Sequence, residues 1–204
     1  AQRLALQLGW HYLDSGAIYR AVAWAALTNK VDITDPQALL PLLDEIDVQM
    51  SPQLGAPSQI YCLGHEISTA IRTEAVGLMA SKISSIELVR KKLMQIQLAT
   101  RQMPGLIADG RDMGTVVFTD AVLKLFLDAS VKERALRRFK QLAQNDVNAH
   151  LTQIEADLVQ RDERDRTRSI SPTIPADDAI LIDTTNLSID EVMARAWEQV
   201  QQSL

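Results

Sequence analysis

The feature that most constrains this chain is its alternation of short apolar runs with longer helical patterns. Compact apolar runs at residues 106–108 and 122–127 have the length and composition of buried parallel strands. An alanine-rich helical pattern covers residues 17–28, and residues 73–101 form another that is interrupted near Ser84. Strands that alternate with helices predict an α/β fold with a parallel sheet.

The remaining elements fit the same plan, apart from one segment. Helices are also expected at residues 1–8, 33–43, 130–144, 151–166 and from 188 onward, and strands at 10–13 and 179–182. Between residues 46 and 69 the pattern changes to alternating apolar positions broken by proline and glycine. That pattern predicts a small set of antiparallel strands.

Composition excludes several classes of function. The chain has 204 residues, 47% of them hydrophobic and 23% charged, as expected for one globular domain with its own core. Its net charge of −5 argues against binding to nucleic-acid polymers or anionic membranes. Cys62 is the only cysteine, which excludes an intramolecular disulfide and a cysteine-based zinc site. The apolar run 21–27 is much shorter than a membrane span of about 20 residues. We therefore expect a cytoplasmic protein.

The first motif with chemical potential is Asp14-Ser15-Gly16, which follows a predicted strand and opens a helix. Ligands of open α/β sheets bind at the carboxyl ends of strands, where helix N-termini present free N–H groups. Arg20 lies about one turn into this helix and suits an anionic ligand. An ordinary helix cap with a solvated arginine is the alternative.

The second motif runs from Gly105 to Gly114. Its apolar strand ends in Asp109, Gly110, Arg111 and Asp112. An acid directly after a buried strand is similar to the Walker-B carboxylate that holds Mg²⁺ in phosphate-transfer enzymes. The alternative is a β-turn built on Asp-Gly.

The third motif is the charged run 161–168, in which residues 161, 164, 165 and 168 share one helix face. That face carries three arginines and one aspartate. A salt-bridged surface is the simpler interpretation. However, residues 130–168 contain nine Lys and Arg against seven Asp and Glu, whereas the rest of the chain is acidic. This local positive charge favours a phosphate-bearing ligand.

These motifs together make the chain similar to the bacterial cytidylate (CMP) kinases, which are P-loop nucleoside monophosphate kinases. The resemblance rests on LDSGAIYRA, IRTEAV, LIADGRDMGTVVF, LFLDAS, ERALRR and RDERDRTR, in this order along the chain. It implies a parallel sheet flanked by helices, with residues 1–34, 85–130 and 169–204 as the core. Residues 35–84 would form the monophosphate-binding region with its small β insert, and residues 131–168 a helical lid.

The resemblance also implies an activity and a set of site residues. The reaction is transfer of the γ-phosphoryl group of ATP to CMP or dCMP, with Mg²⁺ bridging the ATP phosphates. Asp109, the acid that follows the strand of the second motif, is the candidate protein ligand of this ion. The implied cytosine pocket contains Ser81, Arg90 and Asp112; the implied α-phosphate ligands are Arg20, Arg111 and Arg168; and the implied sugar ligands are Ser15, Arg161 and Asp165. Arg111, Asp112 and Arg168 would be the catalytic residues. Lid arginines would come from positions 134, 137, 138, 161, 164 and 168.

The chain departs from this family in one respect, because no G-x-x-x-x-G-K phosphate loop occurs in it. We expect that roughly 20 residues carrying that loop precede Ala1, and that the chain alone is inactive or nearly so. A kinase that prefers UMP, and a nucleotide-binding regulatory module without catalysis, are the alternatives. A monomer is expected.

Overall fold

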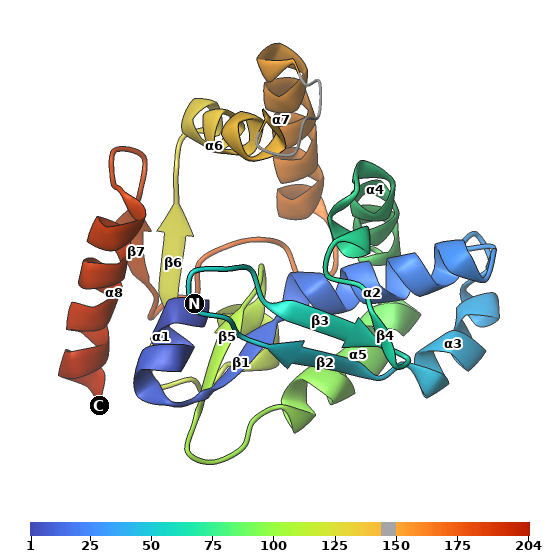
Figure 1. Cartoon of the computed structure of the whole chain (residues 1–204), viewed down its shortest axis with the longest axis horizontal. Helices are drawn as coiled ribbons and strands as arrows, with labels where there is room; N and C mark the ends of the chain where they lie inside the picture. The colour runs from blue at the N-terminus through green and yellow to red at the C-terminus, as the bar shows by residue number, and fades with distance from the viewer. Residues whose placement is uncertain (144–149) are drawn as a thin grey trace. The chain divides into compact units, whose positions relative to one another are not determined.

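The computed structural model describes residues 1–143 and 150–204. These residues divide into two compact units, Ala1–Met113 and Gly114–Leu204 (Figure 1). Each unit contains a two-stranded parallel sheet and several helices. The predicted α/β fold with parallel strands is therefore confirmed. No helix in the described part of the chain is long and apolar enough to cross a membrane.

The first unit begins with three elements that follow one another closely. Helix α1 (Gln2–Leu8) ends at Gly9, whose φ of 66° gives the left-handed conformation that glycine adopts without strain. Strand β1 (His11–Asp14) leads directly into helix α2 (Ser15–Thr28). The helix begins at Ser15, two residues before the start of the alanine-rich pattern at residue 17. Asp14 is its N-cap, because its carboxylate accepts a hydrogen bond from the Ala17 N–H at 2.9 Å.

Strand β5 (Leu106–Asp109) pairs with β1 in parallel, and Asp14 is in register with Asp109. The two carboxylates therefore lie at the same edge of the sheet, where the strands end. At the opposite end, Gly105 approaches the Trp10 indole so closely that a Cβ on residue 105 would lie 2.4–2.7 Å from ring carbons. Only glycine fits at this position.

The segment after α2 contains the predicted antiparallel insert. Strands β2 (Val48–Ser51), β3 (Gln59–Cys62) and β4 (His65–Glu66) form a three-stranded antiparallel sheet, which confirms the prediction. The predicted helix 33–43 is divided into a 3₁₀ helix, Pro36–Leu39, and helix α3 (Leu40–Glu45). Proline explains the division: Pro41 has no N–H with which to continue an α-helix from residue 37.

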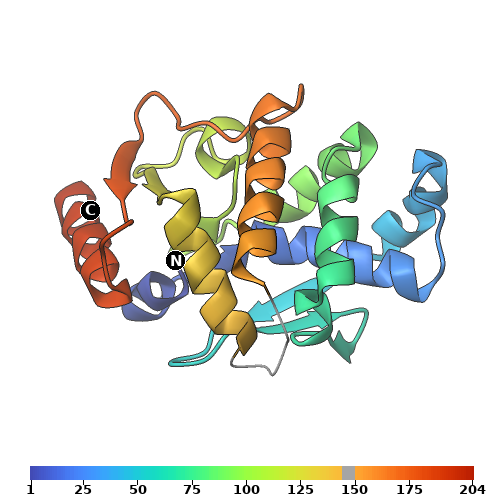
Figure 2. The same cartoon turned by 90° about the horizontal axis from the view of Figure 1, so that it is seen from above.

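Two helices complete the first unit. Helices α4 (Glu74–Ile83) and α5 (Glu87–Ala99) are separated at Ser84 and Ser85, as predicted. The hydroxyls of both serines donate to carbonyl oxygens of the last turn of α4, which competes with continuation of the helix. A 3₁₀ helix, Ala70–Arg72, precedes α4, which packs beside α2 (Figure 2).

The second unit places β6 (Leu125–Asp128) parallel to β7 (Ile180–Asp183). Its helices are α6 (Val131–Ala143), α7 (Leu151–Thr167) and α8 (Ile189–Ser203). Ser188 and Glu191 form a capping box at the start of α8, where a helix was expected. Helices α6 and α7 lie side by side in both views (Figures 1 and 2). Position 144, the expected end of α6, lies outside the described residues.

The strands of the second unit are less buried than the sequence predicts. Strand β6 begins three residues after Val122, whose side chain is 77% exposed. Leu127 and Leu181 are 51% and 67% exposed. A two-stranded sheet covers less side-chain area than a larger parallel sheet, and these apolar strand residues therefore stay accessible. A short π-helix, Met113–Val117, was also not predicted.

Candidate functional site

The most buried charged groups of the first unit are Arg90 and Asp112. Arg90 lies on α5, and Asp112 lies three residues after the end of β5. Their side chains are only 7% and 5% exposed, and Arg90 Nη2 donates to Asp112 Oδ2. Taking both charges out of water is costly unless they are paired, and the close contact between them offsets that cost. The pair therefore holds a guanidinium and a carboxylate in a fixed relative orientation.

Further contacts hold Arg90 from other directions. Its Nη1 donates to the carbonyl oxygen of Ser84 at 3.0 Å, at the end of α4. Its guanidinium carbon lies 5.6 Å from the centre of the Tyr19 ring, on α2. Ser84 also donates from its hydroxyl to the Ser81 carbonyl oxygen, which links the predicted pocket residue Ser81 to Arg90 through one intermediate residue. Helices α2, α4 and α5 thus meet at this guanidinium.

The residues of the first motif lie at the N-terminal end of α2. Ser15 is buried at the start of the helix. Gly110 packs so closely against it that a Cβ added to residue 110 would lie 2.8 Å from the Ser15 Cβ. Arg20 is half-buried and donates from Nη1 to the Ile71 carbonyl oxygen at 2.7 Å. Arg111 is exposed beside the buried Asp112. The predicted pocket residues of this unit are thus carried by the edge of the β1–β5 sheet and by the three helices next to it.

The edge of this sheet also carries the predicted metal ligand. Asp109 is exposed, and Asp14 beside it is largely buried. Burial raises the pKa of the Asp14 carboxyl and the negative charge of Asp109 raises it further, whereas the Ala17 N–H opposes this shift. Burial, followed by the charges of Asp14 and Asp109, also raises the pKa of Tyr12.

These carboxylates fit a magnesium ion that is held mainly by nucleotide phosphates. Mg²⁺ prefers oxygen ligands and is often bound through one or two carboxylates together with substrate phosphates. Among residues 1–143 and 150–204, no group of three or more His, Cys, Asp or Glu side chains is arranged to hold a metal ion. A site built from protein ligands alone is therefore not present in the described residues.

In the second unit, the charged run brings together three of the predicted residues. Asp165 is buried, with Arg161 Nε 3.7 Å from one carboxylate oxygen and Arg168 Nη1 3.8 Å from the other. Helix α7 ends at Thr167, and Arg168 lies just beyond it in extended conformation. Residue 168 was predicted to share a helix face with residues 161, 164 and 165, but it is not part of the helix. Arg164 is exposed and donates to the Gln160 carbonyl oxygen at 3.4 Å. The cluster therefore contains two arginines rather than three.

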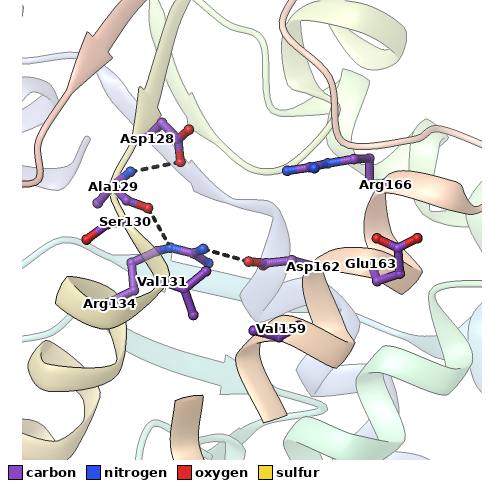
Figure 3. A pocket seen from close by; sticks show the side chains of 9 residues that line it. All are labelled: Asp128, Ala129, Ser130, Val131, Arg134, Val159, Asp162, Glu163 and Arg166. Carbon is purple, nitrogen blue, oxygen red and sulfur yellow. Dashed lines mark hydrogen bonds and ion pairs between the residues drawn. The ribbon is translucent and has the colours of Figure 1, made fainter. Parts of the chain in front are cut away.

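A pocket of about 290 Å³ lies between α6, α7 and the end of β6 (Figure 3). Arg134 of α6 and Arg166 of α7 extend into it. Arg134 is bound on two sides: its Nε donates to the Ala129 carbonyl oxygen at 3.0 Å and its Nη2 lies 2.6 Å from Asp162. Both side chains of this ion pair are partly exposed, at 29% and 20%. The pocket thus mixes cationic and anionic groups that water can reach.

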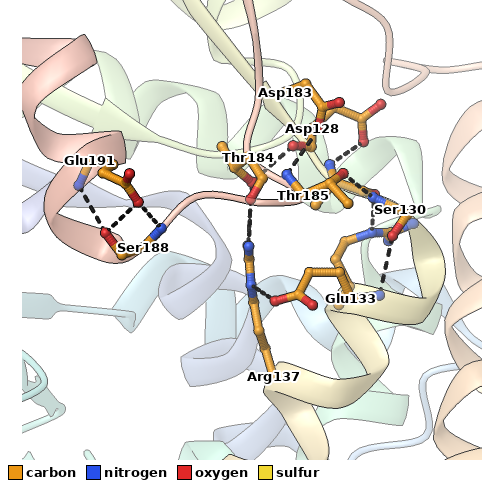
Figure 4. A network of polar contacts seen from close by, with 11 residues as sticks. Asp128, Ser130, Glu133, Arg137, Asp183, Thr184, Thr185, Ser188 and Glu191 are labelled. Carbon is orange, nitrogen blue, oxygen red and sulfur yellow. Dashed lines mark hydrogen bonds and ion pairs between the residues drawn. The ribbon is translucent and has the colours of Figure 1, made fainter.

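A polar network that was not predicted from the sequence lies at the carboxyl ends of β6 and β7 (Figure 4). Thr184 donates from its backbone and its hydroxyl to the Asp128 carbonyl oxygen, at 2.7 and 2.9 Å. Arg137 donates from Nη2 to the Thr184 carbonyl oxygen at 2.6 Å, and from Nε to Glu133. Hydrogen bonds from Thr185 lower the pKa of the Asp183 carboxyl. The available signal was the aspartate that ends each strand, followed by small polar residues.

The predicted residues fall into two sets. The first unit holds Ser15, Arg20, Ser81, Arg90, Asp109, Arg111 and Asp112, and the second holds Arg161, Asp165 and Arg168. Within the units, Arg90 contacts Asp112, and Asp165 lies close to Arg161 and Arg168. That both sets bind one nucleotide stays a prediction.

Comparison with known proteins identifies the family. The cytidylate kinase family model matches residues 1–202. The cytidylate kinase of Coxiella burnetii is 50% identical over 203 residues, which cover 99% of this chain and 86% of the relative. Those of Serratia proteamaculans and Aeromonas hydrophila are 51% and 48% identical over 193 and 204 residues, covering 95% and 100% of this chain and 84% and 88% of the relatives. The chain therefore belongs to the cytidylate kinase family.

Proposed function

We propose that the protein transfers the γ-phosphoryl group of ATP to CMP or dCMP, producing ADP and CDP or dCDP. Membership of the cytidylate kinase family supports this reaction. The observation that carries it in the structure is the buried pair of Arg90 and Asp112. It supplies, at one place and out of water, both an acceptor and several donors of hydrogen bonds.

The chemistry of this pair suits cytosine better than uracil. A carboxylate accepts hydrogen bonds from the exocyclic amine of cytosine, and the guanidinium can donate to O2 and N3 of the ring. Uracil has a carbonyl oxygen in place of the amine, and Asp112 would then face a second acceptor. A buried polar group that is left unpaired costs binding free energy, and this cost is what discriminates between the two bases.

The arginines on both units would supply charge to the phosphates. Arg20 and Arg111 in the first unit and Arg168 in the second are the proposed ligands of the CMP α-phosphate. Phosphoryl transfer requires little covalent chemistry from the protein, so orienting the acceptor phosphate and neutralising its charge are the principal tasks. Arg111, Asp112 and Arg168 are the proposed catalytic residues in this sense. Ser15, Arg161 and Asp165 would bind the sugar hydroxyls, and Ser81 would contribute to the base pocket.

Helices α6 and α7 are the proposed lid. Arg134 and Arg166 extend into the pocket between these helices, and the ion pair of Arg134 is open to water. Side chains held by such accessible pairs can exchange one anionic partner for another at low cost. Closure of a lid over a nucleotide excludes water and brings cations to the phosphates.

Magnesium is the proposed cofactor, with Asp109 as its protein ligand and Asp14 next to it. When bound, the ion neutralises negative charge on the ATP phosphates. The protein's part is to hold a carboxylate at the edge of the sheet. The predictions of a cytoplasmic monomer that binds no nucleic-acid polymer stay predictions.

The test compares CMP, dCMP and UMP. Calorimetric titration of the protein should give tighter binding of CMP and dCMP than of UMP. ADP formation from ATP, measured on the chain extended at its N-terminus with a phosphate loop, should follow the same order. In Asp112→Asn the amide can accept from cytosine or donate to uracil, so the preference for CMP over UMP should fall at least tenfold. Asp44→Asn, which changes an exposed acid paired with Lys92, is the matched control and should keep the preference.

Two outcomes would contradict the proposal. Equal affinity of the unaltered protein for CMP and UMP would remove the argument from the buried pair. Tight binding of CMP without ADP formation, even in the chain extended with a phosphate loop, would favour a nucleotide-binding regulatory module.

A further inference from the structure

The aromatic ring beneath Arg90 has no role in the function proposed so far. Tyr19 lies on α2, directly before Arg20, and is only 8% exposed. Its ring centre is 5.6 Å from the guanidinium carbon of Arg90, within the range of a cation–π contact. Such a contact is strongest when both groups are out of water, as they are here.

The contacts of Arg90 restrict its guanidinium in different ways. The Asp112 carboxylate and the Ser84 carbonyl oxygen accept hydrogen bonds from two of its nitrogens, and these bonds lie close to the guanidinium plane. The guanidinium carbon lies over the Tyr19 ring, whose negative π face attracts the cation. Removal of the ring would take away this contact and leave the hydrogen bonds to Asp112 and Ser84, so the guanidinium would be held less firmly against tilting.

We infer that Tyr19 is a positioning residue that sets the base preference of the nucleotide pocket by holding the Arg90 guanidinium in plane with the base it reads. This inference rests on the proposed function of the Arg90–Asp112 pair. Bidentate recognition of a flat base needs donors and acceptor in one plane, and a tilt of the guanidinium weakens its bonds to O2 and N3 of cytosine. The ring itself does not need to contact the nucleotide.

Tyr19 and Arg20 are consecutive residues of α2 but contact different parts of the first unit. Consecutive helical residues point about 100° apart around the helix axis. Tyr19 therefore faces α5 and Arg90, while Arg20 reaches the Ile71 carbonyl oxygen before α4. One helical turn thus carries both the support for the base-reading arginine and a proposed phosphate ligand.

The first test compares three variants by titration with CMP and UMP. In Tyr19→Leu, which keeps an apolar side chain but has no π face, the ratio of CMP to UMP affinity should fall about tenfold. Tyr19→Phe keeps the ring and should retain the ratio within about twofold. Ile18→Ala removes a fully buried side chain from the same turn of α2, so it should lower stability and leave the ratio unchanged.

Kinetics give a second measurement that a merely structural role would not change. In the chain extended with a phosphate loop, the KM for CMP should rise in Tyr19→Leu with little change in kcat, because the ring supports the arginine that binds the base and not the transferring phosphoryl group. An equal loss for CMP and UMP, or a loss in Tyr19→Phe as large as in Tyr19→Leu, would overturn the inference.

A fluorination series covers the case in which Tyr19→Leu fails to fold. Phenylalanine analogues with one, two or three ring fluorines at position 19 keep nearly the same shape but progressively weaken the negative π face. The CMP preference should fall stepwise along the series, and a constant preference would overturn the inference. If the unaltered protein shows no preference for CMP, the proposed function fails instead, so the two failures are distinguishable.

Discussion

The two units hold their arginines in different ways. In the first unit, Arg90 is buried, contacts the Asp112 carboxylate directly and lies against an aromatic ring. In the second unit, the Arg134–Asp162 pair is partly exposed, and Arg161 and Arg168 lie 3.7 and 3.8 Å from Asp165. Burial fixes an ion pair, because separating its members leaves an unpaired charge away from water, whereas exposed pairs exchange partners readily. The difference between the Arg90–Asp112 and Arg134–Asp162 pairs suits a rigid base reader in the first unit and an adaptable lid arginine, Arg134, in the second.

The largest effect is expected when the buried pair of the first unit is broken. Arg90→Met leaves Asp112 buried without a partner and should cost about 3–5 kcal/mol of unfolding free energy, measured by urea denaturation. The double variant Arg90→Met/Asp112→Leu should recover most of that loss but should not bind CMP. A loss below about 1 kcal/mol in the single variant would show that water reaches Asp112 and that the pair is not rigid.

The next test concerns close packing rather than charge. Gly105→Ala places a Cβ within 2.4–2.7 Å of the Trp10 indole, at the start of the strand that leads to Asp112. The resulting overpacking should cost about 1–3 kcal/mol, measured in the same denaturation assay. Gly114→Ala in the second unit is the matched control, because the atoms nearest to its Cβ would be Lys124 side-chain carbons at 3.1–3.6 Å, which is a much milder contact. Equal losses at the two glycines would contradict the greater rigidity of the first unit.

A smaller effect is expected at the exposed pair of the second unit. Arg134→Met removes the contact with Asp162, and both groups remain accessible to water. The loss of stability should be about 1 kcal/mol or less, and the preference for CMP over UMP should stay unchanged because the base pocket is untouched. A loss as large as that of Arg90→Met would show that the lid arginine is as firmly held as the base-reading arginine.

The smallest effect is expected at Cys62, in the antiparallel insert. The rate at which its thiol is labelled tests whether the insert is as rigid as the rest of the first unit. Burial, with a contribution from the Asp47 charge, raises the pKa of this thiol from 9.0 to about 11. The thiolate is the reactive form, so iodoacetamide should label the folded protein very slowly at pH 8 and rapidly in urea.

The same pKa shift gives a dependence of stability on pH. The folded state keeps the thiol proton above pH 9.0, where the unfolded chain releases it, so Cys62 stabilises the fold below about pH 9 and loses that contribution as the pH rises towards 11. Cys62→Ala should remove this contribution to the pH dependence. Rapid labelling of the folded protein at pH 8 would show that the insert opens independently of its unit.

Local patterns in the sequence predicted most elements of the fold. Gly9 ends α1, Ser84 and Ser85 separate α4 from α5, and Ser188 begins α8, because each acts on backbone groups only a few residues away. The start of β6 was placed too early because an apolar residue such as Val122 can lie on the surface as well as in a strand. Long-range burial, and not local propensity, decides between these alternatives.

The candidate site was predictable in its residue types but not in its contacts. Arg90 and Asp112 were named through the family resemblance, whereas their direct pairing and the ring of Tyr19 depend on three helices meeting. Nothing in the local pattern around residue 19 distinguishes a core tyrosine from a support for a distant arginine. The contact between Gly105 and Trp10 likewise could not be predicted, because it depends on how the two strands pair.

The direct junction between β1 and α2 leaves no room for length variation at this place in the chain. Asp14 is both the last residue of the strand and the cap of the helix. One inserted residue would rotate the following helix by about 100° relative to the strand. Tyr19 would turn away from Arg90, and Arg20 would turn away from Ile71. A single codon insertion here should therefore be far more damaging than one in the segment between α3 and β2.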